Sequence, residues 1–151
     1  MRKEEFAKRI EQVRSKLYKT AMLYLGNETL AMDALDETIY KAFCGYKKLR
    51  EEQYFDTWIT RILINECHNE QRRQVRFNHM EEIPETAEER YDSLPLKEAV
   101  KSLPEELKTI IILRYFAGFS LVETAEMLGI PQGTAATRQR KALKLLKLEL
   151  E

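Results

Sequence analysis

Apolar residues recur every three or four positions along most of the chain, and this spacing predicts amphipathic helices. The first apolar stripe predicts a helix from about residue 3 to residue 25. Its members are Phe6, Ile10, Val13, Leu17, Ala21 and Leu25. Gly26 and Asn27 follow, a pair suited to end one helix and cap the next. A second stripe predicts a helix over residues 28–46. Its members are Leu30, Ala34, Leu35, Ile39, Ala42 and Phe43.

A third stripe begins after Asp56, which the pattern places as the N-cap of another helix. Its apolar members are Trp58, Ile59, Ile62, Leu63 and Cys67. This helix runs into the polar stretch NEQRRQVRFNH. Residues 78–93 then show no period and carry an acidic excess, which predicts a flexible linker.

The second half of the chain restarts at Pro95, a residue suited to the first turn of a helix. Pro104 interrupts the pattern and starts a further helix over residues 105–116, after which Ala117 and Gly118 turn the chain. Two more helices follow. The pattern therefore predicts an all-α chain with three helices, a linker and then four helices.

A short helix, a glycine turn and a longer basic helix occupy residues 120–149. Ser120 and Glu123 have the spacing of a capping box, and Gly129 can adopt the left-handed backbone that such a turn needs. The last helix has five basic side chains and no acidic one between residues 129 and 147: Arg138, Arg140, Lys141, Lys144 and Lys147. This is the helix-turn-helix pattern of DNA-binding proteins. The same charges are also compatible with a solvated C-terminal helix that has no nucleic-acid role.

The net charge is zero, with 25 basic and 25 acidic side chains, which argues against a strong stand-alone nucleic-acid binder. The distribution is uneven: residues 1–73 carry +2, residues 74–96 carry −4 and residues 97–151 carry +2. An acidic segment thus separates two mildly basic parts. The longest apolar run, residues 110–113, is too short to span a membrane, and the first residues lack a signal core, so export is not expected.

No motif in the chain predicts catalysis or a metal site. Cys44 and Cys67 have no metal-type spacing, and Cys67 with His68 and His79 fits no usual zinc pattern, so neither a metal nor another cofactor is expected. Glu66 and Glu70 are four residues apart, as many solvated pairs are. A nucleophile elbow and a phosphate loop are both missing from the sequence, so the chain is not expected to be an enzyme.

Two stretches together resemble a known family. "DALDETIYKAFCGYKKL…YFDTWITRILINECHNEQRR" resembles region 2 of bacterial RNA polymerase sigma factors, and "LPEELKTIIILRYFAGFSLVETAEMLGIPQGTAATRQRKAL" resembles their region 4. Two regions with a short linker, and nothing similar to regions 1.1 or 3, resemble the extracytoplasmic-function (ECF) group.

The resemblance implies two small helical domains joined by a flexible acidic linker. Residues 1–77 would bind core polymerase and the minus-ten element, residues 78–93 would form the linker, and residues 94–151 would hold a helix-turn-helix for the minus-35 element. It implies a factor that directs core RNA polymerase to promoter DNA and assists promoter melting. It also implies a cytoplasmic location and an anti-sigma factor as partner, which in this family is often tethered to the membrane.

The resemblance implies three sets of site residues. For core polymerase these are Asp33, Asp36, Glu37 and Tyr40. For the minus-ten element they are Tyr54, Trp58, Arg61, Asn65, Arg72 and Arg73. For the minus-35 element they are Thr134, Ala136, Thr137, Arg138, Arg140, Lys141 and Lys144.

The chemistry of these residue types is suited to the roles. Aromatic side chains, with Phe55 as a further candidate, can stack on an extruded base, and arginine can pair with phosphate. The alternatives are that Trp58 belongs to the core and that the acidic residues form a solvated helix face.

Four positions depart from the family pattern. Thr124, Ala135 and Gln139 stand where larger apolar residues are usual, and Ala136 stands where a basic residue is frequent. Because smaller side chains bury less apolar surface, we expect a less rigid C-terminal module.

Two alternative functions remain open at this point. A stand-alone helix-turn-helix DNA-binding transcription regulator would carry more positive charge and a dimerisation element, neither of which is evident. An interaction protein that keeps the fold but has lost promoter reading stays open because of Ala135 and Ala136.

Overall fold

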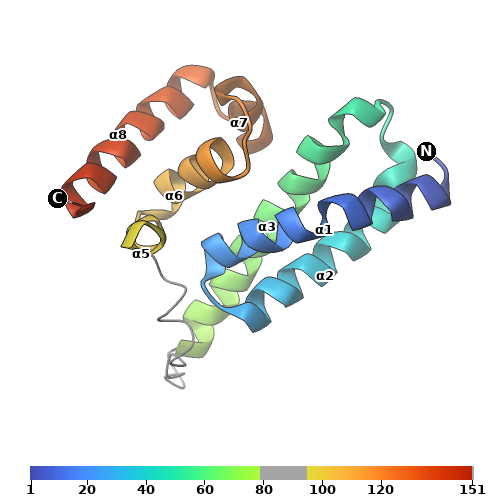
Figure 1. The fold of residues 1–151 in the computed structure, drawn as a ribbon, viewed down its shortest axis with the longest axis horizontal. Helices are drawn as coiled ribbons and strands as arrows, with labels where there is room; N and C mark the ends of the chain where they lie inside the picture. Colours follow the sequence, from blue (N-terminus) through green and yellow to red (C-terminus); the bar gives the residue numbers. More distant parts are fainter. Residues whose placement is uncertain (79–94, 151) are drawn as a thin grey trace. The chain divides into compact units, whose positions relative to one another are not determined.

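A computed structural model of the chain describes residues 1–78 and 95–150, and these residues form helices and turns with no strand among them (Figure 1). The predicted order of three helices followed by four is confirmed. The predicted linker, residues 78–93, lies outside the described residues apart from its first position. The chain divides into two compact units, Met1–Glu70 and Gln71–Glu151, which are described separately.

The first unit begins with two helices that lie side by side (Figure 1). Helix α1 spans Lys3–Leu25 and helix α2 spans Glu28–Gly45. Between them Gly26 has φ +66°, the left-handed conformation that favours glycine, and the Asn27 side chain accepts a hydrogen bond from the Leu30 N–H at 3.0 Å. These two caps satisfy backbone groups at both helix ends and let the chain reverse within two residues.

Helix α3, Phe55–Asn78, completes the core of the first unit. Its buried face carries Phe55, Ile59, Leu63, Ile64 and Cys67. Fully burying one such aliphatic or aromatic side chain contributes about 1.5–3 kcal/mol, so this face accounts for much of the unit's stability. The ring of Phe6 in α1 stacks on Tyr46 at a centroid distance of 4.5 Å, which closes the core at the end of α2.

Two expectations for this unit are wrong. Asp56 is not the N-cap of α3, because the 3-10 helix η2, Glu52–Tyr54, leads directly into it and Phe55 is already helical at φ −57° and ψ −48°. Asp56 therefore lies in the first turn. Phe43, expected to be buried, is 48% exposed, because Thr38 and Ala42 occupy the inner face of α2 and leave Phe43 at its edge.

Over residues 95–150 the second unit holds helices α5 to α8. Helix α5 spans Pro95–Lys101 and helix α6 spans Glu105–Ile111, with Pro104 at the break between them. The expected continuous helix over residues 105–116 instead changes at Ile112 to a π-helix, η3, over Ile112–Phe116. The Ala117 N–H donates to the Ile112 carbonyl at 2.9 Å, the five-residue spacing of that wider turn.

Helices α7 and α8 form the helix-turn-helix. Helix α7, Leu121–Leu128, starts at the predicted capping box and ends at Gly129, which has φ +66°. Helix α8 spans Gln132–Leu150. Ile110, Ala125 and Ala135 form the buried centre of the motif, and Leu121, Leu128 and Ile130 pack against it. Since two of the three central residues are alanines, helices α7 and α8 can approach closely.

Candidate nucleic-acid interface

The outward face of α8 is basic. Ala135, Ala142 and Leu146 are buried against the rest of the second unit. Five polar exposed positions interleave with them at helical spacing: Thr137, Arg140, Lys141, Lys144 and Lys147. Leu148, 63% exposed, lies among them. No carboxylate stands among these five, so the face combines hydrogen-bond donors with net positive charge. Such a surface is suited to phosphate contacts and to forked contacts with guanine.

Arg138 does not lie on that open face. Its side chain is 27% exposed, and its Nη2 lies 3.7 Å from the Glu106 carboxylate of α6. An ion pair this open to water contributes about 0–1 kcal/mol. A phosphate can therefore replace Glu106 as the partner of Arg138 at little cost.

The first turns of α8 carry the remaining predicted contacts. Thr134 and Ala136 are half-buried. The Thr137 hydroxyl donates to the Gly133 carbonyl at 3.0 Å, and Arg140 Nη2 lies 3.4 Å from the Thr137 oxygen. The first bond orients the Thr137 hydroxyl, and the second holds the Arg140 side chain along the helix.

The departures noted in the sequence have defined surroundings. Ala135 is fully buried in the centre of the motif. Thr124 is also fully buried, and its Oγ1 finds no hydrogen-bond partner among the residues that the structure describes. A buried hydroxyl without a partner is destabilising. Whether the unit is less rigid as a result stays a prediction.

Gln139 makes a polar contact at a position where the family pattern has a larger apolar residue. Its Oε1 accepts from Arg114 Nε at 2.9 Å, and Arg114 Nη1 donates to the Phe119 carbonyl at 2.9 Å. Arg114 comes from the π-helix and thus joins the middle of α8 to the segment before α7. Sequence reasoning missed Arg114. The available signal was a single arginine among the mostly apolar residues Ile110–Phe116, whereas nothing in the sequence indicated Gln139 as its partner.

The capping box of α7 lowers the pKa of the Glu123 carboxyl. The Ser120 N–H donates to the Glu123 carboxylate at 2.9 Å, and the Glu123 N–H donates to the Ser120 hydroxyl at 3.1 Å. The hydrogen bond from the Ser120 backbone to the carboxylate, followed by hydrogen bonding with the Ser120 side chain, holds the pKa of Glu123 below its ordinary value. The carboxylate is therefore ionised at neutral pH, where it stabilises the start of α7.

The first unit has a mixed acidic and apolar face on α2. The four residues of the predicted polymerase set are all exposed at spacings of three and four: Asp33, Asp36, Glu37 and Tyr40. Met32 and Phe43 add exposed apolar surface beside them. Acidic groups around exposed apolar residues form a surface that suits a protein partner better than DNA.

A second exposed face follows α3, which begins in the first unit and continues past its limit at Glu70. The minus-ten set begins at Tyr54, which is 55% exposed at the end of η2. Trp58, Arg61, Asn65 and Arg72 follow at spacings of three, four and seven, which places them on one side of the helix. Arg61, Asn65, Arg72 and Arg73 are exposed and Trp58 is half-buried. The structure thus brings aromatic, amide and basic groups together in one stripe.

Two aromatic expectations have different outcomes. Phe55 is 1% exposed and belongs to the core, so its expected role as a wall for a base is wrong. Trp58 lies between the core and the surface: its ring centroid is 5.9 Å from that of Phe55, and its side chain is half-buried. Tyr54 and Trp58 are therefore the aromatic surfaces that remain on this face.

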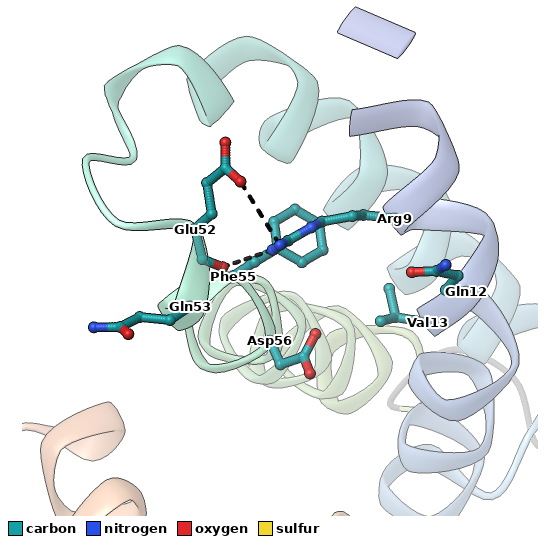
Figure 2. A pocket seen from close by; sticks show the side chains of 7 residues that line it. All are labelled: Arg9, Gln12, Val13, Glu52, Gln53, Phe55 and Asp56. Carbon is teal, nitrogen blue, oxygen red and sulfur yellow. Dashed lines mark hydrogen bonds and ion pairs between the residues drawn. The ribbon is translucent and has the colours of Figure 1, made fainter. Parts of the chain in front are cut away.

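Arg9 of α1 and the N-terminal ammonium of Met1 both contact the segment before α3, and Figure 2 shows the Arg9 contact. Arg9 of α1 donates from Nη1 to the Glu52 carbonyl at 2.6 Å, and its Nη2 lies 3.8 Å from the Glu52 carboxylate. The guanidinium also lies over the Phe55 ring at 5.4 Å. A pocket of about 270 Å³ opens beside these groups. It is lined by Arg9, Gln12, Val13, Glu52, Gln53, Phe55 and Asp56.

The groups considered for metal binding have other contacts. His68 Nε2 lies 2.7 Å from the Tyr24 hydroxyl, and His79 lies outside the described residues. Glu66 and Glu70 are buried rather than solvated, and Glu66 pairs with Lys41 of α2. Over residues 1–78 and 95–150, no group of three or more histidine, cysteine or acidic side chains could hold a metal ion. In the same part of the chain, no helix has the length and apolar character that a membrane span requires.

Two family models match the chain: Sigma-70 region 2 over residues 9–77 and Sigma-70, region 4 over residues 99–148. The RNA polymerase sigma factor SigV of Bacillus subtilis (strain 168) is 33% identical over 138 residues, covering 88% of this chain and 83% of the relative. The ECF RNA polymerase sigma-E factor of Haemophilus influenzae is 30% identical over 139 residues, covering 79% and 74%.

Solved structures show the same fold. The sigma factor RpoE of Bartonella quintana, crystallised with the anti-sigma factor NepR, matches with a TM-score of 0.81 at 23% identity and covers 97% of both chains. CnrH, in complex with the cytosolic domain of CnrY, matches with a TM-score of 0.77 at 20% identity, covering 99% of this chain and 89% of that one.

Proposed function

The chain belongs to the ECF group of RNA polymerase sigma factors, and we propose from this premise how its described faces divide the work of initiation. The α2 face binds core RNA polymerase. The α3 stripe with Tyr54 binds and opens the minus-ten element, and the basic face of α8 reads the minus-35 element. We propose domain limits of 1–77 and 94–151, in keeping with the two matched regions.

The observation that carries this proposal is that two kinds of exposed surface are kept separate within the first unit. The α2 face is acidic with apolar surface around Tyr40, whereas the α3 stripe is basic and aromatic. The negative charge of the α2 face would repel DNA, and the positive charge of the α3 stripe would attract it. A factor that must hold a protein and a melted strand at once needs two such faces.

The α3 stripe has the groups that promoter opening requires. Tyr54 and Trp58 offer aromatic surface on which an unstacked base can rest, and Asn65 can both donate and accept hydrogen bonds to a base edge. Arg61, Arg72 and Arg73 supply charge for the phosphates. Capture of the single strand offsets the cost of unstacking the duplex.

The α8 face supplies the duplex contact. The helix is anchored by Ala135, Ala142 and Leu146, so its orientation is set by the second unit, and Arg140, Lys141 and Lys144 extend outward from it. With a net charge of zero over the whole chain, this face alone gives weak DNA affinity. Core polymerase then supplies the remaining affinity.

We propose that the protein works in the cytoplasm as a non-enzymatic initiation factor and that an anti-sigma factor regulates it. RpoE was solved with the anti-sigma factor NepR, and CnrH was solved with the cytosolic domain of CnrY. In this chain the α2 face is the surface such an inhibitor would cover, because covering it blocks polymerase binding. A membrane tether on the inhibitor would hold the complex at the membrane.

Reconstituted transcription with core polymerase on a promoter library tests the proposal. We expect initiation to depend on the added protein, and the paired variant Arg140→Ala/Lys144→Ala to lower minus-35-dependent initiation about tenfold or more. Lys97→Ala, which removes an exposed charge from α5, is the control and should act as wild type. Core binding without initiation at any promoter would contradict the proposal and favour an interaction protein.

A further inference from the structure

We propose that Arg9 of α1 is a positioning residue for promoter opening, because it holds the segment of residues 49–54 that presents Tyr54. This inference rests on the proposed function of the α3 stripe. The segment runs between two buried rings, Tyr46 and Phe55, and Arg50, Glu51, Glu52, Gln53 and Tyr54 are all exposed. Five consecutive exposed residues bury little surface that could fix their conformation.

The segment's own backbone bonds are local. The Leu49 N–H donates to the Tyr46 carbonyl at 3.2 Å, and the Tyr54 N–H donates to the Glu51 carbonyl at 3.1 Å. Bonds over three residues shape each turn, but they do not attach the segment to the rest of the unit. Attachment comes from residues that are distant in sequence. The Met1 ammonium lies 3.8 Å from the Glu52 carboxylate, and Arg9 bonds the main chain itself.

Arg9 makes that attachment with one guanidinium (Figure 2). It donates to the main-chain carbonyl of Glu52 at 2.6 Å across 43 positions of sequence, approaches the same residue's carboxylate and rests on the Phe55 ring. Because the acceptor is a main-chain atom, the contact fixes the path of the backbone. Because the guanidinium also packs on the buried Phe55 ring, it fixes the backbone of the segment relative to the core of the unit.

The consequence concerns Tyr54 and Trp58. Tyr54 is two residues beyond the bonded carbonyl, and the Trp58 ring lies beside Phe55, on which Arg9 rests. Both aromatic side chains of the α3 stripe therefore have their positions set, in part, from α1. Loss of Arg9 keeps every residue of the α3 stripe but makes Tyr54 and Trp58, on which the unstacked strand would rest, more mobile.

The first test uses the free protein and needs no polymerase. In Arg9→Ala we expect amide hydrogen exchange in residues 49–55 to quicken about tenfold, as for the loss of one charge-assisted hydrogen bond. Trp58 is the sole tryptophan, so acrylamide quenching of its fluorescence should rise as well. Exchange and quenching equal to wild type would overturn the proposal.

Arg14→Ala is the matched control. Arg14 is an exposed arginine of the same helix, and it pairs with Glu11 one turn away on α1 at 3.0 Å. Its loss removes the same charge without touching the segment, so both signals should stay at the wild-type level. Glu52→Ala keeps the main-chain acceptor, removes the ion pairs of the carboxylate with Arg9 and Met1, and should change exchange less than Arg9→Ala does. A larger effect of Glu52→Ala would show that the main-chain bond is not the anchor.

The second test uses the holoenzyme with 2-aminopurine in the minus-ten element. We expect Arg9→Ala to slow promoter opening about tenfold while core binding and minus-35 duplex binding match those of Arg14→Ala. Faster exchange with normal opening would overturn the positioning role. If wild-type holoenzyme opens no promoter, the proposed function fails, and the exchange result still decides whether Arg9 holds the segment.

Discussion

The two helices proposed to contact DNA, α3 and α8, are packed into their units through different kinds of contact. Helix α3 is seated by large side chains, with Phe55, Ile59 and Leu63 fully buried beneath its outer stripe. Helix α8 is seated at its N-terminal half by Ala135 and by a hydrogen bond from Arg114 to Gln139. The first arrangement derives its stability from buried area, whereas the second derives it from close approach and directed polar contacts.

This difference bears on what each helix is proposed to do. A helix that captures an unstacked strand must resist the force of a duplex that tends to close again. A helix that lies in a groove needs an accurate orientation more than it needs resistance to load. The following changes separate the two arrangements, from the largest expected effect to the smallest.

Truncation of the core under α3 should have the largest effect. Leu63→Ala is expected to lower the free energy of unfolding of the first unit by about 2–5 kcal/mol, because it leaves a cavity in a fully buried site. The matched change under α8, Ala135→Gly, should cost only about 1 kcal/mol, through backbone entropy. Urea unfolding read by hydrogen exchange separates the two units, and equal losses would contradict the comparison.

Removal of an exposed aromatic ring should affect function without a comparable loss of stability. Tyr54→Ala is expected to weaken capture of the minus-ten single strand by about 1–3 kcal/mol, the range for one stacked base. Tyr40→Ala makes the same chemical change on the α2 face and should weaken core binding instead. Strand binding and core binding are measured separately by fluorescence anisotropy. If Tyr54→Ala weakened core binding and Tyr40→Ala weakened strand binding, the assignment of the two faces would be reversed.

The hydrogen bond from Arg114 to Gln139 should appear as a coupling energy between these two side chains. We expect Arg114→Ala and Gln139→Ala, combined in a double-mutant cycle, to give a coupling of about 1 kcal/mol in stability. Promoter selections with Gln139→Leu should give an altered minus-35 preference, since the directed bond is lost while apolar volume is kept. A coupling near zero would mean that Arg114 does not orient α8.

The capping box should give the smallest effect, and one that depends on pH. The pKa of Glu123 is lowered in the folded protein, so its contribution is present at neutral pH and is lost as pH falls from about 4.3 toward the folded pKa. We expect Glu123→Gln to cost about 0.3–0.5 kcal/mol at pH 7, a low value because the carboxylate is open to solvent. Thermal unfolding should show the gap between the two proteins closing in acid, and a constant gap would contradict this origin.

Elements governed by local chemistry could be read from the sequence. Gly26, Ser120 and Gly129 act through bonds within a few residues, and the structure confirms all three caps. The apolar period likewise predicted where each helix exists. The outward positions of α8 and α2 follow from the same period once the buried side is known.

Features that depend on distant partners could not be read in this way. Asp56 fits a cap by its type, but the preceding 3-10 helix brings Phe55 into α3 first. Glu66 is paired with Lys41, 25 positions away, so its burial has no local signal. Arg9 and Arg114 act on residues that only the fold brings near. The sequence thus predicted which side chains of α2 and α8 are exposed better than it predicted the long-range contacts that hold these helices in place.

The π-helix at Ile112–Phe116 has a consequence for insertions and deletions in this part of the chain. A π-turn accommodates one residue more than an α-turn, so it is a position where a single residue can be lost and the helix can close as a regular α-helix. Such a deletion between Ile112 and Arg114 would rotate the arginine by about 100° around the helix axis. Gln139 would then lose its partner although every residue of α8 was unchanged. A related chain shorter by one residue here would need a different way to seat its α8.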